Sequence, residues 1–150
     1  MCIRDGAVAA AAPAGEIRFA ALARPGTAQY TLAWKFKELV EARSAGRYTV
    51  TIDPAGTPAR ESEVLEQLRS GGLHVAVIAA AALENLLPTT RVLSFPFLFA
   101  TGEQADQVLD GPLGAAILRD AETIGCRGLG FTEGGFRHLS NSIRPVRTAD

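Results

Sequence analysis

The sequence predicts an α/β fold in which a mainly parallel β-sheet is flanked by helices. Two observations support this prediction. Segments with the period-2 spacing of strands alternate along the chain with segments that have the 3.6-residue spacing of helices, which is typical of βαβ units. One segment, Leu73–Ala79, is an almost continuous apolar run, as in a parallel strand covered on both faces. The 150 residues are enough for one domain with a hydrophobic core.

The first part of the chain contains a strand, a helix and a second strand. The mostly apolar run from Glu16 to Ala23 predicts a strand, and the Arg-Pro-Gly that follows predicts a turn. Thr27 is placed to cap a helix that runs to about Arg43, because apolar residues then recur at helical spacing. Residues 48–52 alternate between apolar and polar side chains, which is the pattern of a half-buried strand.

The middle of the chain predicts shorter elements. Glu61–Ser70 is expected to form a helix with acidic side chains in its first turn, where the helix dipole favours them. The strand Leu73–Ala79 follows, and Ala80–Leu87 predicts a small helix. The apolar stretch Val92–Phe99 is interrupted by Pro96, which cannot donate a backbone hydrogen bond, so we expect a strand end or a buried loop there.

Two helices and a strand are predicted in the last part. Glu103–Leu109 forms the first helix, and Pro112 suits the first position of the next helix, which Gly125 ends. We expect this second helix to bury a stripe made of Leu113, Ala116, Ile117, Ala121 and Ile124. Cys126–Phe131 predicts a last buried strand.

The composition excludes several classes of protein. Apolar residues make up 47% and charged residues 21%, which is typical of a globular domain. The net charge of −1 gives no basic excess, so no nucleic-acid partner is expected. The two cysteines and two histidines are too far apart in sequence to suggest a metal site. Phosphate-binding and nucleophile-elbow motifs are absent, so we expect no cofactor, no catalytic residue and no enzymatic activity.

The first 14 residues stand apart from the rest of the chain. Residues 7–14 are small and alanine-rich, like the cleavage end of a secretory signal, but the larger apolar core of such a signal is missing. Two interpretations stay open. The segment 1–14 is a signal-peptide remnant, or it is a flexible tail, and its first five residues belong to no predicted element.

Arg137 is the candidate ligand-binding residue that the residue pattern itself singles out. Its guanidinium offers a planar fork that matches a carboxylate in two parallel hydrogen bonds. Gly134 and Gly135 precede it and allow the backbone to approach a ligand closely. The alternative is a surface arginine that pairs with a local acid such as Glu133.

The order of the segments resembles the extracytoplasmic solute-binding subunit of TRAP transporters, the DctP-type family. The resemblance runs from about Ile17 to the last residue, and its most specific phrases are FPFLF and GFRHLSNSIRP. It implies a periplasmic, non-enzymatic receptor with two α/β lobes, which is a monomer when complete. Such a receptor captures a small organic acid and delivers it to TRAP membrane permease subunits for sodium-coupled uptake. On this resemblance Arg137 and Asn141 are the ligand-binding residues.

The chain departs from the family pattern at several positions. Gly134 stands where the family usually has asparagine, which puts a side-chain contact there in doubt. Ala21 and Ala79–Ala82 stand where polar contact residues occur in the family, so the expected cleft wall is apolar and hints at a less hydroxylated ligand.

The resemblance also divides the chain. Residues 15–133 correspond to the N-terminal lobe of a periplasmic-binding-protein-like fold, and residues 134–150 to the start of the crossover into a second lobe that this truncated chain lacks. We expect a single lobe to bind its ligand poorly. Two other classes remain as alternatives: an ABC-type periplasmic binding protein, and a small α/β enzyme whose active site is not recognisable from sequence.

Overall fold

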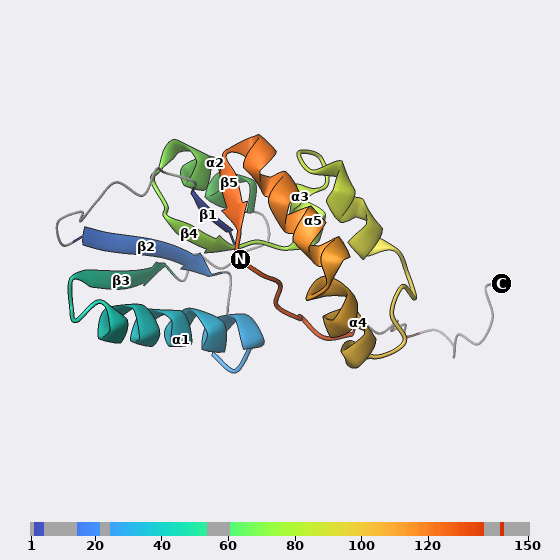
Figure 1. The fold of residues 1–150 in the computed structure, drawn as a ribbon, viewed down its shortest axis with the longest axis horizontal. Helices are drawn as coiled ribbons and strands as arrows, with labels where there is room; N and C mark the ends of the chain where they lie inside the picture. The colour runs from blue at the N-terminus through green and yellow to red at the C-terminus, as the bar shows by residue number, and fades with distance from the viewer. Residues whose placement is uncertain (1, 5–14, 22–24, 54–60, 137–141, 143–150) are drawn as a thin grey trace.

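The structure is a computed structural model that describes residues 2–4, 15–21, 25–53, 61–136 and 142. Its centre is a five-stranded sheet with the strand order β3-β2-β4-β1-β5 and helices on both sides (Figure 1). The strands are β1 (Cys2–Arg4), β2 (Gly15–Ala21), β3 (Tyr48–Asp53), β4 (Val75–Val77) and β5 (Cys126–Gly128).

The sheet is mainly parallel. Strand β2 pairs in parallel with both β3 and β4, whereas β1 is antiparallel to both β4 and β5. Four strands therefore run in one direction and β1 alone is reversed among the described strands. The predicted α/β class with a mainly parallel sheet is confirmed.

The helices follow the predicted order. They are α1 (Ala28–Arg43), α2 (Glu61–Ser70), α3 (Ala80–Leu83), the 3-10 helix η2 (Pro88–Ser94), α4 (Gly102–Leu109), α5 (Pro112–Asp120) and the 3-10 helix η3 (Ala121–Ile124). The predicted cap of α1 is confirmed, because the side-chain oxygen of Thr27 accepts a hydrogen bond from the Tyr30 backbone N–H at 3.3 Å. Within the described ranges, none of these helices is both long enough and apolar enough to cross a membrane.

Each face of the sheet has its own hydrophobic core. On the α1 side, Phe19 and Val75 pack with Val50 and with Ala33 of α1, and the Phe19 ring meets the Phe36 ring edge-on at 5.2 Å. The opposite core consists of Ala20, Val64, Leu68, Leu73, Ala76, Leu87, Ala121 and Cys126. Neighbouring residues of β2 and β4 thus point to opposite cores, so β4 is covered on both faces as predicted. The strand is shorter than the predicted 73–79, because it spans only Val75–Val77, and His74 and Ala79 are exposed.

Strand β3 lies at one edge of the sheet, and α1 satisfies part of that edge. The Val50 backbone N–H donates to Glu41 Oε1 at 2.9 Å, and Lys37 Nζ donates to the Val50 carbonyl at 2.6 Å. Lys37 and Glu41 also form an ion pair at 2.8 Å. The hydrogen bond from Lys37, and next the one from Val50, lower the pKa of Glu41 below its ordinary value of 4.5. Side chains of α1 therefore form hydrogen bonds with backbone groups that an edge strand would otherwise leave unpaired.

Strand β1 is absent from the sequence predictions. Cys2–Arg4 lies between β4 and β5, and it is the sheet's link to β5, since β5 pairs with β1. A three-residue strand has too little alternation to be recognised, and its partners lie more than 70 residues away in sequence. Residues 5–14 of the predicted tail lie outside the described residues.

Three other predictions needed correction. The stretch Val92–Phe99 is neither a strand end nor a buried loop: it begins inside η2 and then becomes exposed, with Phe95 at 65% and Phe97 at 101% exposure. Pro96 provides no N–H, and Phe97 has a positive φ of 59°, so the chain turns outward instead of pairing. The last strand stops at Gly128, and Leu129 beyond it is 41% exposed.

The third correction concerns the helix predicted from Pro112. It ends at Asp120 and continues as η3, and its buried stripe runs through Gly114, Ile117 and Ala121, while Leu113 is 49% exposed. The cause is a close approach at Gly114, where a side-chain carbon would lie 1.8 Å from the Leu109 carbonyl oxygen. Because α5 packs against the end of α4 through this glycine, Leu113 is not part of the buried stripe.

Candidate functional site

The candidate site lies at the edge of the sheet where the parallel strands end. Strands β2, β4 and β5 run in the same direction, so Ala21, Val77 and Gly128 all lie towards this edge. Open α/β sheets bind ligands at the carboxyl ends of their strands. The segment 129–136 continues from β5 at this edge and runs to the side of α4 (Figure 1).

The strand ends themselves are mostly apolar, as predicted. Ala21 and Val77 are buried at 2% and 8% exposure, and Ala79 presents an exposed methyl group just beyond β4. One carboxylate breaks this apolar wall, because Glu61 Oε1 accepts a hydrogen bond from the Ala79 backbone N–H at 3.4 Å.

From sequence, Glu61 was expected only as an acid in the first turn of its helix, with no role in a site. Helix α2 connects the parallel strands β3 and β4, so it runs back along the sheet and starts at the carboxyl edge. An acid in its first turn is therefore brought to the end of β4. That topology was available from the strand-helix-strand order and could have identified the residue.

The segment that precedes Arg137 passes close to two helices. A side-chain carbon on Gly102, in the first turn of α4, would lie 3.3 Å and 3.4 Å from the two carboxylate oxygens of Glu133. A side-chain carbon on Gly134 would lie 3.6 Å from Nε2 of Gln29 in α1. Gly135 has a φ of 81°, which favours glycine. The backbone therefore passes α1 and α4 and then turns, two residues before Arg137.

The predicted ligand-binding residues Arg137 and Asn141 lie outside the described residues, so their role stays a prediction. The histidine that the structure describes, His74, is not part of the candidate site. His74 lies at the amino end of β4, away from the candidate site, where its Nδ1 accepts the Arg18 backbone N–H at 3.0 Å. Among the residues that the structure describes, no group of three or more His, Cys, Asp or Glu side chains could hold a metal ion.

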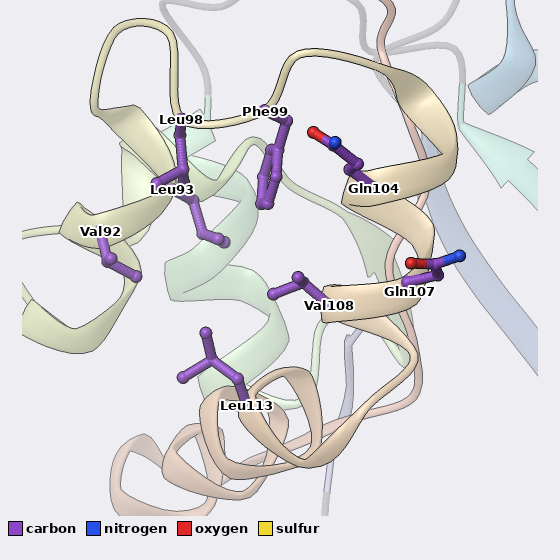
Figure 2. Close-up of a pocket in the computed structure, with 8 residues that line it drawn as sticks. All are labelled: Val92, Leu93, Leu98, Phe99, Gln104, Gln107, Val108 and Leu113. Carbon is purple, nitrogen blue, oxygen red and sulfur yellow. The ribbon is translucent and has the colours of Figure 1, made fainter.

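A separate apolar pocket of about 380 Å³ lies between η2, α4 and α5 (Figure 2). Its lining residues are Val92, Leu93, Leu98, Phe99, Gln104, Gln107, Val108 and Leu113. Gln104 Oε1 accepts the Ala100 backbone N–H at 3.1 Å, while the amide of Gln107 points away from the other labelled side chains in Figure 2. None of these residues comes from the strand ends or from the segment 131–136, so the pocket is distinct from the candidate site.

Comparisons with known proteins agree on one family. Residues 19–150 match the family described as DctP, bacterial extracellular solute-binding protein, family 7. A solute-binding protein of Verminephrobacter eiseniae is 36% identical over 75% of this chain and 33% of its own length. The 2,3-diketo-L-gulonate-binding periplasmic protein YiaO of Escherichia coli is 28% identical over 80% of this chain and 37% of its own length.

Solved structures agree with this match. A TRAP periplasmic solute-binding protein of a Polaromonas species, bound to D-erythronate, superimposes with a TM-score of 0.75 and 29% identity over 88% of this chain and 44% of its own length. The chain thus spans roughly a third to under a half of the length of these three relatives, and it corresponds to their N-terminal part.

Proposed function

The chain belongs to the DctP family of bacterial extracellular solute-binding proteins, and from this membership we propose that it is the N-terminal lobe of a receptor for small organic acids. The observation that supports this proposal most directly is the path of residues 131–136. They leave the carboxyl edge of the sheet, pass between α1 and α4, and lead into Arg137.

In this proposal Arg137 binds the ligand carboxylate through a bidentate, charge-assisted pair of hydrogen bonds. Asn141 contributes a second polar contact. A second lobe closes over the ligand and removes water from the pair, which strengthens it in the lower local dielectric. The complete receptor works in the periplasm and passes the acid to TRAP permease subunits for sodium-coupled uptake.

The ligand class that we favour is a sugar acid with one carboxylate, in place of the less hydroxylated ligand that the apolar strand ends suggested from the sequence. The E. coli relative is named for 2,3-diketo-L-gulonate and the Polaromonas structure holds D-erythronate. Glu61 supports this choice over a dicarboxylate. Its carboxylate at the end of β4 accepts hydrogen bonds from hydroxyl groups and repels a second negative charge.

The proposal is tested by titrating the ¹⁵N-labelled chain with D-erythronate, with succinate and with the neutral polyol erythritol. We expect erythronate to shift the backbone amide signals of Gly134 and Gly135 with an affinity near the millimolar range, because this chain supplies only one lobe. Succinate should bind more weakly, and erythritol should not bind.

Arg137→Gln should weaken erythronate binding about tenfold or more, since a hydrogen bond to a charged group contributes about 1.5–3 kcal/mol. Arg127→Gln, which removes an exposed arginine of β5, is the matched control and should leave the affinity unchanged. Equal binding of erythritol, or an unchanged affinity in Arg137→Gln, would overturn the proposal. Sub-micromolar binding by this chain would contradict the role given to a second lobe.

A further inference from the structure

We infer that the position between β4 and β5, which β1 fills in this chain, is an acceptor for an extended segment that returns from the second lobe of a complete receptor. When that segment is present, it takes the place of Cys2–Arg4. This inference rests on the proposed function, because it requires a second lobe, but it concerns the sheet and not the ligand site. We call this place in the sheet the acceptor position.

The acceptor position has to be filled in the folded chain. Val75 and Ala76 of β4 and Cys126 of β5 have no exposed surface. Among the described strands, β5 is joined to the sheet only through β1. Without a strand between them, the backbone groups of β4 and β5 that face the gap would lose their hydrogen-bond partners in surroundings that exclude water, which costs free energy. An extended segment is therefore required there.

Strand β1 is the part of the sheet that another segment can replace most easily. It has three residues, and it pairs with β4 through Cys2 and Ile3 and with β5 through Cys2–Arg4. It lies at the N-terminus, and terminal segments stay ordered only where such contacts hold them. Another strand conserves this pairing, because every residue except proline supplies the same backbone N–H and C=O groups.

The family match indicates that the relatives fill the acceptor position from elsewhere in their chains. The match begins at residue 19, so β1 lies outside it. Within the described part of the matched region, no other segment lies between β4 and β5. The Polaromonas receptor shares this fold, and the superposition covers only 44% of its chain. Because this chain corresponds to the N-terminal part of its relatives, most of their additional residues follow that part and can supply the strand.

The direction of β1 indicates where such a segment comes from. Cys2 pairs with Gly128, near the carboxyl ends of the parallel strands, and Arg4 pairs with Cys126 at the start of β5. A strand in the acceptor position therefore enters the sheet at the carboxyl edge and runs towards the opposite edge. Residues 129–136 leave the sheet at that same carboxyl edge (Figure 1). A segment that comes back from a lobe beyond this edge reaches the acceptor position in the antiparallel direction of β1, and it needs no crossover.

The experiment extends the full 150-residue chain at Asp150 with the remaining C-terminal residues of the Polaromonas receptor, and in a second chimera with those of the Verminephrobacter eiseniae protein. Backbone hydrogen–deuterium exchange is measured in the parent chain and in both chimeras. We expect Cys2–Arg4 to exchange about tenfold faster or more in the chimeras, because a displaced terminal segment has lost its hydrogen-bond partners. Val75–Val77 and Cys126–Gly128 should stay equally protected in all three chains, since the acceptor position remains filled.

Proline substitutions test the same displacement through stability. Ile3→Pro removes a backbone N–H and disrupts strand pairing. It should lower the urea midpoint of the parent chain and leave the midpoint of the chimeras unchanged, because β1 no longer contributes to their sheet. Ile17→Pro is the matched control. Its strand β2 lies between β3 and β4, so it should lower the midpoint in the parent chain and in the chimeras alike.

Two results would overturn the inference: protection of Cys2–Arg4 that persists in both chimeras, or loss of protection in β4 and β5 together with β1. The first result includes an exchange of β1 between two copies of the chain, because that arrangement keeps β1 paired. Erythronate binding by the chimeras separates this inference from the proposed function. Displacement of β1 without erythronate binding contradicts the proposed function and supports the inference, whereas erythronate binding with β1 still protected does the reverse.

Discussion

The region formed by α1, β2 and β3 differs in construction from the region formed by β4, β1, β5, α4 and α5. The first has a 16-residue helix packed on strands of seven and six residues, and its edge is closed by Lys37 and Glu41. The second has three strands of three residues each and short helices, and Leu113 of α5 is half exposed. The loop that leads into α4 exposes two further apolar side chains, Phe95 and Phe97.

The difference shows how far each region depends on residues that are close in sequence. In the first region, β2, α1 and β3 are consecutive and contact one another, so local patterns are enough to define the packing. In the second region, β5 is joined to the sheet through β1 at the opposite end of the chain. Substitutions in the two regions should therefore have different consequences.

Phe19→Ala should have the largest effect on stability. Phe19 has no exposed surface and packs against Phe36 in the core on the α1 side. Removing its ring leaves a cavity as well as losing buried apolar area, so the free energy of unfolding should fall by about 3–5 kcal/mol. Urea denaturation followed by circular dichroism measures this loss. A fall of less than about 1 kcal/mol in the free energy of unfolding would contradict close packing around Phe19.

Gly128→Ala should have an intermediate effect in the second region. A side-chain carbon on Gly128 would lie 2.6 Å from the Leu118 carbonyl oxygen and 2.8 Å from its Cα, so α5 would have to move away from β5. Overpacking of this kind costs about 1–3 kcal/mol. Gly130→Ala is the control, because nothing lies within 4 Å of the added carbon. Equal midpoints of denaturation for the two variants would contradict the close packing of β5 on α5.

Phe97→Asn should have a small effect of the opposite sign. Phe97 is fully exposed and has a φ of 59°, a conformation that asparagine adopts more readily than phenylalanine. The variant should be as stable as the parent chain or more stable by up to about 1 kcal/mol. A clear loss of stability in Phe97→Asn would contradict this expectation, because it would mean that the phenylalanine ring makes stabilising contacts.

The pH dependence of Glu41 should be the smallest effect. Because its pKa in the folded chain is lowered from 4.5, the ionised side chain stabilises the fold above that pH, and this contribution is lost as the pH falls through the lower folded-state value. Glu41→Gln should therefore be less stable at neutral pH and should lose less stability on acidification than the parent chain. Glu38→Gln, which breaks the more exposed pair with Lys35, is the control and should retain the parent slope.

Most of the fold could be predicted from the sequence. The bounds of α2 and the cap and end of α1 follow from local signals such as Thr27 and the acids of the first turn of α2. The failures had two causes: β1 needs partners far along the chain, and the buried stripe of α5 depends on how closely Gly114 packs on the nearby Leu109 carbonyl at the end of α4. No local pattern records either contact.

Less of the candidate site could be predicted. The ability of Arg137 to pair with a carboxylate follows from its residue type and from the glycines before it. Its role in ligand binding is a prediction from the family resemblance. The surroundings that the structure adds, Glu61 beside Ala79 and Glu133 beside Gly102, join residues 18 and 31 positions apart. Pairings of this kind follow from the packing of helices on the sheet, and only the placement of Glu61 was available from topology.

The position of β1 also has a consequence for the order of folding. Ile3 pairs with Val75 on one side and with Arg127 on the other, so the sheet is completed by residues from opposite ends of the chain. During synthesis, α1, β2 and β3 can assemble long before β5 has been made. Strand β1 can pair with β4 once β4 has been made, but its pairing with β5 must wait for β5, and the entropy of closing so long a loop slows this step. The pairing of β1 with β5 is thus the one that should be completed last.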